Sequence, residues 1–282
     1  IVNMTTMIPN ANELFDGMGS LSAKHYSNYP PLNQLIFALG ALLGGKSILG
    51  SVIVMRSTII LADIGIFYFG HKLLKNINKS PHLIYWYILN PLVIIELTGN
   101  LHFEGVMLFF FVWALYLISV HKWQKAAVVY ACSICVKLIP LLFLPLFLKY
   151  FKFKKSIGFY SIIAITTLLL FFPFYSSAFI ANYSKTISLW FSNFEFNAGF
   201  YNAVKQIAIQ FDVKPWKLIK TYGLITTLVT IFGVLLITFT RKNEKITVLI
   251  SSMLMVLALY YFMSATVHPW YVIFLVVLAT FT

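Results

Sequence analysis

Long runs of apolar residues, separated by short polar segments, dominate the chain from residue 50 onward. A helix needs about 20 residues to cross the hydrocarbon core of a bilayer, and these runs approach that length. The runs that predict spanning helices are 50–70, 82–98, 104–120, 156–176, 218–240, 246–263 and one that begins at residue 270. The shorter stretch 32–45 predicts a helix lying along the membrane interface.

Composition leads to the same class. Of the 282 residues, 60% are hydrophobic and 10% are charged, and the mean hydropathy is +0.85. A soluble domain carries about 25% charged residues, so this chain would expose large apolar patches to water. A closed barrel would show alternating strands of about ten residues. The predicted fold class is therefore all-α: a polytopic integral membrane helical bundle, with residues 1–282 forming a single transmembrane domain.

The net charge of +13 would suggest a nucleic-acid partner in a soluble protein. No aromatic–basic RNA motif is present, so the expected partners are membrane lipids and not nucleic acid. More than half of the 21 Lys and Arg residues lie in four short loops, at 71–80, 121–125, 149–155 and 241–245. The positive-inside rule makes these loops cytoplasmic. The outer loops are then 1–49, 99–103, 177–217 and 264–269.

The stretch 126–148 is the exception, because as a single span it would join two basic loops. Lys137 and Pro140 lie at its middle. Non-helical backbone at membrane depth is tolerated where protein or a wet cavity surrounds it. We therefore predict a hairpin that enters from the cytoplasmic side, turns near Lys137 and returns, with a single span as the alternative.

Ionisable residues within spanning segments need a partner or a function, since each costs about 2.5–3.5 kcal/mol at a helix centre. Arg56 and Asp63 lie seven residues apart on one face of a predicted helix. They form a structural ion pair, or Arg56 binds a lipid-linked phosphate. Lys137 has no acid nearby in sequence. It either pairs with a residue on another helix or contacts a phosphate as a point charge.

The segment ELTGNLHFEG, residues 96–105, concentrates polar groups at one predicted outer turn. Glu96, Asn100, His102 and Glu104 lie there. Two carboxylates and an imidazole suit general base catalysis or binding of sugar hydroxyls. The alternative is that they cap helices and satisfy the backbone of the turn.

The predicted outer loop SATVHPWYV, residues 264–272, contains His268 directly before Pro269, Trp270 and Tyr271. Aromatic residues at a span boundary are ordinary interfacial anchors. A histidine beside them, on the same predicted side as Glu104, makes His268 and Trp270 candidates for substrate binding.

The longest predicted outer loop contains WFSNFEFNAGFYN, residues 190–202. Its aromatic rings, amides and single acid suit sugar stacking and hydrogen bonds, so Glu195 and Asn197 are candidate substrate-binding residues. An amphipathic interfacial helix is an equally simple interpretation.

Cys132 and Cys135 lie at helical spacing in an apolar run without partner ligands. Buried cysteines usually pack as small apolar residues. The Glu and His spacing around residue 102 is not HExxH, so no metal site is predicted.

Several segments together resemble motifs of the GT-C superfamily, and more narrowly its bacterial mannosyltransferase-like membrane proteins. The segments are HYSNYPPLNQ (25–34), NPLVIIELTGNLHFEG (90–105), KLIPLLFLP (137–145), NFEFNAGFYN (193–202) and TVHPWY (266–271). The resemblance implies an inverting glycosyltransferase in the bacterial inner membrane with an extracytoplasmic active site. It would move a hexose, such as mannose, from a polyprenyl-phosphate donor to a glycan or lipid acceptor.

Relatives usually carry the catalytic carboxylate in the first outer loop, just after the first span. We expect that span to be absent here and the usual Asp to be missing with it, and Glu13 and Asp16 are the acids left in the loop. Asp16 and, from the 96–105 turn, Glu104 are the candidate catalytic carboxylates. Arg56 or Lys137 would balance charge on the leaving phosphate. No cofactor is required with a monophosphate leaving group, although some relatives use a divalent cation.

Two other functions fit the same pattern of charges in an apolar bundle. A transporter or flippase of lipid-linked glycans would use them along a substrate path, although such proteins commonly show repeated halves, which this sequence lacks. A non-catalytic scaffold would not depend on them. The chain begins at Ile1 and stops at Thr282 within an apolar run, which predicts a fragment lacking an N-terminal span and a C-terminal tail.

Overall fold

The fold is described from a computed structural model for residues 11–18, 26–192 and 194–282. Within these residues, one isolated bridge between Phe196 and Thr266 is the sole pairing of extended backbone. The helices are α1 Ala11–Gly17, α3 Pro31–Leu43, α4 Ile48–Asn76, η1 Pro81–Ile84, α5 Tyr85–Ile88, α6 Pro91–Val93, η2 Ile94–Gly99, α7 Glu104–Ser119, α8 Trp123–Val136, η3 Ile139–Leu146, α9 Phe147–Phe171, η4 Phe172–Phe174, α10 Ser177–Ser192, α11 Gly199–Gln210, α12 Pro215–Thr240, α13 Ile246–Met263, η5 Pro269–Tyr271 and α14 Val272–Thr280. The all-α fold class is confirmed.

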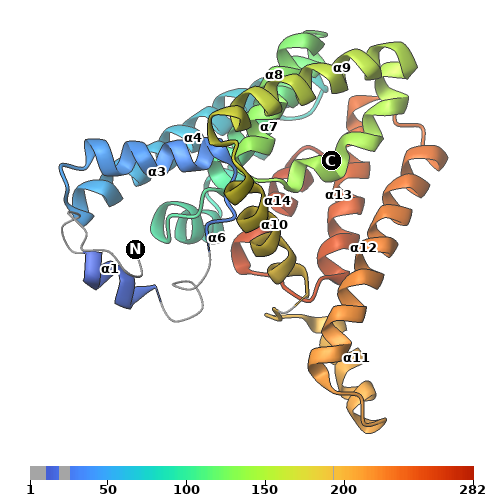
Figure 1. The fold of residues 1–282 in the computed structure, drawn as a ribbon. Coiled ribbons are helices and arrows are strands. Elements are labelled where there is room, and N and C mark those ends of the chain that lie inside the picture. Colours follow the sequence, from blue (N-terminus) through green and yellow to red (C-terminus); the bar gives the residue numbers. More distant parts are fainter. Residues whose placement is uncertain (1–10, 19–25, 193) are drawn as a thin grey trace.

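Helices α4, α7, α8 and α9 pack against one another along one side of the molecule, while α12 and α13 form the other side (Figure 1). Gly65 of α4 allows the close approach of α7. A Cβ atom at this position would lie 2.3 Å from the ring of Phe109 on α7. Phe111 contacts both Tyr130 of α8 and Phe274 of α14, with ring centroids 5.8 and 4.9 Å apart. These rings join the two sides in one apolar core.

Four stretches in the described part of the chain are long and apolar enough to cross a membrane: 48–76, 139–174, 215–240 and 246–263. The predicted straight span over 82–98 is wrong. Proline begins both η1 and α6, and the Asn90 side chain accepts a hydrogen bond from the Leu92 amide, so the helix restarts there. The stretch 91–99 then bends by 116° into α7.

The chain reverses at Lys137, as predicted. Lys137 has extended backbone angles, φ −148° and ψ 141°, between α8 and η3. The Tyr130 hydroxyl donates to the Pro140 carbonyl at 2.7 Å, and a Cβ at Gly158 would lie 3.1 Å from Trp123. The start of α8 and the early part of α9 therefore lie side by side, and the chain from 123 to 151 forms a hairpin.

The four basic loops meet at one end of the bundle. Asn76 donates to Ser119 at 3.0 Å, and Lys149 donates to the Arg241 carbonyl at 3.2 Å. One cavity at this end is lined by parts of three of these loops. Glu104 and Lys137 lie at the other ends of α7 and α8. The residues that carry candidate chemistry are thus separated from the basic loops by the length of α7, about 24 Å.

The segment 177–217, expected as an outer loop, contains α10 and α11. Figure 1 shows α11 projecting from the bundle beside the start of α12. Tyr201 of α11 packs against Tyr222 of α12, with ring centroids 4.8 Å apart. The helical alternative therefore holds for α10 and α11, whereas residues 194–198 between them are not helical.

Candidate functional site

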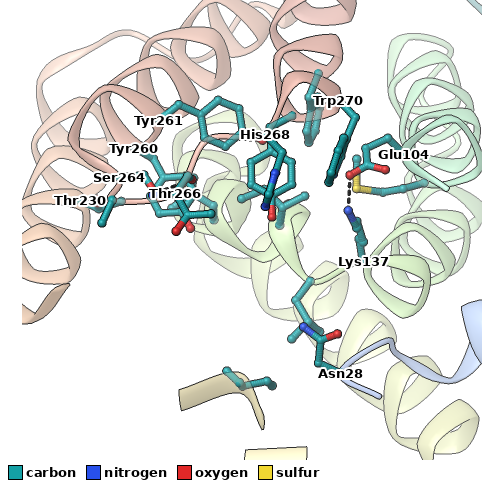
Figure 2. A pocket seen from close by; sticks show the side chains of 18 of the residues that line it. Asn28, Glu104, Lys137, Thr230, Tyr260, Tyr261, Ser264, Thr266, His268 and Trp270 are labelled. Atoms are coloured by element: carbon teal, nitrogen blue, oxygen red, sulfur yellow. Dashed lines mark hydrogen bonds and ion pairs between the residues drawn. The ribbon is translucent and has the colours of Figure 1, made fainter. Parts of the chain in front are cut away.

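A cavity of about 510 Å³ opens between α7, the α8–η3 turn, α12, the end of α13 and η5. Figure 2 shows its two sides, with Lys137, Glu104 and Trp270 on one and Thr230, Ser264 and Tyr260 on the other. Its lining residues are Asn28, Tyr29, Pro30, Glu104, Met107, Lys137, Leu138, Ile139, Leu142, Ile187, Gly223, Thr226, Thr227, Thr230, Tyr260, Tyr261, Ser264, Ala265, Thr266, His268, Trp270, Tyr271 and Phe274.

The Lys137 ammonium donates a hydrogen bond to Oε1 of Glu104 in this cavity (Figure 2). Glu104 is 4% exposed, and its Oε2 is buried without a hydrogen bond. The Lys137 Nζ atom also lies 5.3 Å from the Tyr271 ring centroid. The end of α8 at Val136 and the start of α7 at Glu104 bring the two charges together across 33 residues. In a buried pair of this kind each member is the counter-ion of the other.

Four rings form a continuous stack beside the pair. His102 lies 3.6 Å from Trp270 by ring centroid, His268 lies 4.4 Å from its other face, and Phe196 lies 4.5 Å beyond His268. Both faces of Trp270 are therefore covered by imidazoles. Its indole contributes an edge to the cavity wall and holds the two histidines in place, so it does not provide an open face for a sugar.

Burial lowers the pKa of both histidines from the usual value of 6.5. For His268 the positive charge of Lys137 lowers the pKa further, and Glu104 opposes this effect. For His102 the nearby Glu104 and Glu96 raise the pKa but do not offset burial, and Lys137 lowers it. Both imidazoles are therefore neutral at pH 7, which leaves each with one nitrogen that accepts a hydrogen bond.

The turn that carries His102 is held by polar contacts. Glu96 Oε2 lies 3.5 Å from His102 Nε2 and accepts a hydrogen bond from Asn100 at 3.2 Å. The Arg56 guanidinium donates to the carbonyls of Thr98 at 2.9 Å and Gly99 at 3.3 Å. Arg56 thus caps the end of η2 and does not line the cavity.

The alternative ion pair between Arg56 and Asp63 does not form. Asp63 instead accepts a hydrogen bond from the Tyr87 hydroxyl at 2.6 Å in the core between α4 and α5. Seven residues correspond to about 10 Å along a helix axis. Arg56 and Asp63 are therefore two turns apart, which is too far for their side chains to form an ion pair directly.

Three further candidates lie away from the cavity lining. Asp16 is exposed on α1, which Figure 1 places away from α13 and α14. Glu195 is 43% exposed and pairs with Lys205 at 2.7 Å. Asn197 is exposed and has a positive φ of 49°, a conformation that asparagine tolerates well. The structure therefore unites Glu104, Lys137, His268 and Trp270 at the cavity, with His102 stacked behind them.

Sequence reasoning missed the hydroxyl groups on the opposite wall. Thr226 and Thr230 lie one turn apart on α12, and Ser264 and Thr266 follow α13. The Thr226 hydroxyl donates to the Met263 carbonyl at 3.2 Å, whereas the Thr230 hydroxyl is buried and makes no hydrogen bond. The i, i+4 spacing of the two threonines within an apolar run places them on one face of the helix, and it is the one sequence signal that could have pointed to this wall.

Across the described parts of the chain, no group of three or more His, Cys, Asp or Glu side chains is placed to hold a metal ion. Cys132 and Cys135 are free thiols, and Cys135 is buried in α8. The cavity's charged chemistry comes from the Lys137–Glu104 pair.

The all-helical fold, with four apolar helices of spanning length in its described part, defines a polytopic integral membrane protein. Residues 5–151 match the MptA_B family, alpha-(1->6)-mannopyranosyltransferase, N-terminal domain. This match covers more than half of the 282 residues, and the chain belongs to that family. A comparison with curated proteins found no match.

Membership of a mannosyltransferase family confirms the expectation of a membrane glycosyltransferase, which requires a sugar donor and an acceptor. The matched residues include Glu104 and Lys137. His268, Trp270 and the hydroxyl wall of α12 and α13 lie beyond the matched range. The cavity is therefore shared between the family's N-terminal domain and the following helices.

Proposed function

We propose that this chain transfers mannose from a polyprenyl-phosphate donor to a glycan or lipid acceptor, and that the reaction takes place in the cavity lined by Lys137 and Glu104. The observation that carries the proposal is this charged pair in an otherwise largely apolar cavity. A lysine there supplies a positive point charge to a lipid phosphate. Leu138, Leu142 and Phe274 supply apolar wall for the adjacent isoprenoid.

The proposed reaction forms one bond and breaks one. The acceptor hydroxyl oxygen attacks the anomeric carbon of the donor, and the bond from that carbon to the phosphate oxygen breaks. The electron pair stays on polyprenyl phosphate, whose second negative charge Lys137 stabilises. The acceptor proton moves to Glu104, whose Oε2 is free of hydrogen bonds.

Glu104 is placed to serve as this base. Lys137 donates to its Oε1, which leaves Oε2 without a hydrogen bond and free to take the acceptor proton. We propose Glu104 as the base in preference to Asp16, which does not line the cavity.

The hydroxyl wall on the other side is suited to sugars. Thr226, Thr227 and Thr230 line the cavity from α12, and Thr230 carries a buried hydroxyl without a partner. A buried hydroxyl without a hydrogen bond costs free energy that a sugar hydroxyl would recover. The neutral His268 beside this wall can accept a further hydrogen bond.

The positive-inside rule supports an extracytoplasmic site in the bacterial inner membrane. The basic loops gather at the far ends of α7 and α8, so an orientation with these loops in the cytoplasm puts the cavity toward the opposite face. The proposed chemistry uses no divalent cation, and we expect transfer to persist in EDTA.

Transfer from radiolabelled polyprenyl-phosphate mannose by the purified protein tests the proposal. We expect Glu104→Gln and Lys137→Met each to reduce kcat by about a hundredfold or more, the size typical of loss of a general base or of an electrostatic contact to the transition state. Lys125→Met and Asp212→Asn are matched controls on exposed residues outside the cavity, and we expect wild-type turnover from both.

Transfer at the wild-type rate by both Glu104→Gln and Lys137→Met would remove this cavity as the reaction site. Lipid movement across a vesicle membrane without mannose transfer would instead support the flippase alternative.

A further inference from the structure

A second cavity, of about 630 Å³, lies at the opposite ends of α7 and α8 from the proposed active site. Its wall combines the turn after α7, the start of α8, the first part of α9 and the loop before α13. The lining residues are Ile118, His121, Trp123, Tyr150, Phe151, Lys152, Phe153, Lys154, Lys155 and Glu244. Three chain segments that are distant in sequence thus build one site.

The cavity carries an excess of positive charge. Lys152, Lys154 and Lys155 face it together with a single acid, Glu244. None of these four residues takes part in an ion pair within the described ranges. Lysines that lack a carboxylate partner are available to bind an anion from outside the chain.

The backbone holds these lysines at the cavity. The positive φ of 59° at Lys152 interrupts the helical path, and the Ser156 hydroxyl donates to the Lys152 carbonyl at 2.8 Å. Phe151 is anchored next to the interruption by its ring contact with Phe159, at a centroid distance of 4.8 Å. The break turns residues 152–155 around the cavity instead of continuing a straight helix.

Aromatic residues form the remainder of the wall. Trp123, Tyr150 and Phe151 line it, and Phe153 is 71% exposed. Six of its lining residues, 150–155, belong to the candidate membrane span 139–174. Aromatic rings and long lysine side chains together are typical of the layer where lipid head groups meet acyl chains.

We infer that this second cavity binds an anionic phospholipid, with the lysines around the head-group phosphate and the aromatic rings against the start of the acyl chains. The apolar wall distinguishes this ligand from a free phosphate ion, which gains nothing from aromatic contacts. The inference does not depend on the reaction proposed for the other cavity.

Native mass spectrometry of the detergent-solubilised protein, titrated with phosphatidylglycerol, tests the inference. Neutralising Lys152, Lys154 and Lys155 to Gln together should weaken binding by about a hundredfold, since each basic residue at a lipid phosphate contributes about fivefold. The matched control neutralises Lys75, Lys125 and Lys242, three exposed lysines of the same end that do not line the cavity. We expect that control to weaken binding by less than about threefold.

Replacing the three cavity lysines by Arg should retain binding, which separates loss of charge from loss of folding. Equal weakening by both neutralised triples would overturn the inference, because it indicates general attraction to a basic surface. Equal affinity for phosphatidylcholine with the same acyl chains, or for inorganic phosphate alone, would overturn it as well.

Discussion

The two cavities contain lysines in opposite circumstances. Lys137 is 20% exposed and is paired with Glu104, whereas Lys154 and Lys155 are exposed and have no ion pair in the described residues. The difference follows from access to water. A largely buried ammonium requires a counter-ion, while an exposed ammonium is solvated and can remain unpaired.

This comparison shows that a buried lysine comes with a second charged residue. The need to neutralise Lys137 ties Glu104 to the same place, so cation and carboxylate enter the cavity as a unit. At the basic end no ion pair ties Lys154 or Lys155 to an acid within the described ranges, which leaves them available for the proposed lipid phosphate. The same residue type therefore serves proposed chemistry at one end and proposed lipid binding at the other.

The largest effect should follow from breaking the buried pair. Glu104→Ala leaves an unpaired ammonium in the cavity, and we expect it to lower the free energy of unfolding by about 3–5 kcal/mol. The double variant Glu104→Gln with Lys137→Met removes both charges and should recover most of that loss, while mannose transfer remains absent. Reversible unfolding in mixed micelles measures the stability of both variants.

A double variant as unstable as Glu104→Ala would contradict this interpretation of the pair. It would indicate that the two residues contribute through packing, and that their charges are not the reason for the loss.

A smaller effect is expected from the ring stack beside the pair. Trp270→Leu removes the two stacking contacts with His102 and His268 and should lower the free energy of unfolding by about 1–3 kcal/mol, the sum of two aromatic contacts. Trp270→Phe keeps a flat ring and should lose less. Thermal melting in detergent separates the two variants, and equal melting temperatures for both would show that the stack contributes little.

The same stack predicts a decrease of stability in acid. Burial lowers the pKa of His102 and His268 below 6.5 in the folded state, so the unfolded chain binds more protons as the pH falls. The contribution of the two neutral histidines to the free energy of unfolding should be fully present above pH 6.5. It should be lost as the pH falls from 6.5 through the folded pKa values. Melting temperatures from pH 8 to pH 5 test the sign.

The variant His102→Asn with His268→Asn is the control, because it removes both titrating groups. Its melting temperature should fall less with acidification than that of the wild type. A wild-type melting temperature that increases over this interval would contradict the predicted direction.

The sequence predicted the fold best where apolar runs carry no internal break. The predicted span over 246–263 coincides with α13, and 104–120 differs from α7 by one residue. Hydropathy alone failed over 82–98, because Pro91 and the capping side chain of Asn90 divide a run whose average is still apolar. Average hydropathy does not register such local hydrogen bonding.

The site was predicted in part for a related reason. Glu104 and Lys137 are conspicuous because charge is rare in apolar runs. Thr230 was missed because a threonine in a spanning helix commonly bonds to its own backbone, so its presence alone carries little information. Glu195 and Asn197 were chosen from the composition of a loop, and composition does not define the direction in which a side chain points.

The smallest effect is expected at the second Lys–Glu pair, which sharpens the contrast with the buried one. Lys205 and Glu195 lie 2.7 Å apart, and the two lysines are similarly exposed, at 17% for Lys205 and 20% for Lys137. The carboxylates differ, because Glu195 is 43% exposed and Glu104 is 4% exposed. Exposed pairs contribute about 0–1 kcal/mol, so Lys205→Met should change the free energy of unfolding by less than about 1 kcal/mol. The effect should shrink further in high salt, because ions screen exposed charges. A loss as large as that of Glu104→Ala would mean that burial does not distinguish the two pairs, and the assignment of the proposed chemistry to the buried pair would lose its physical basis.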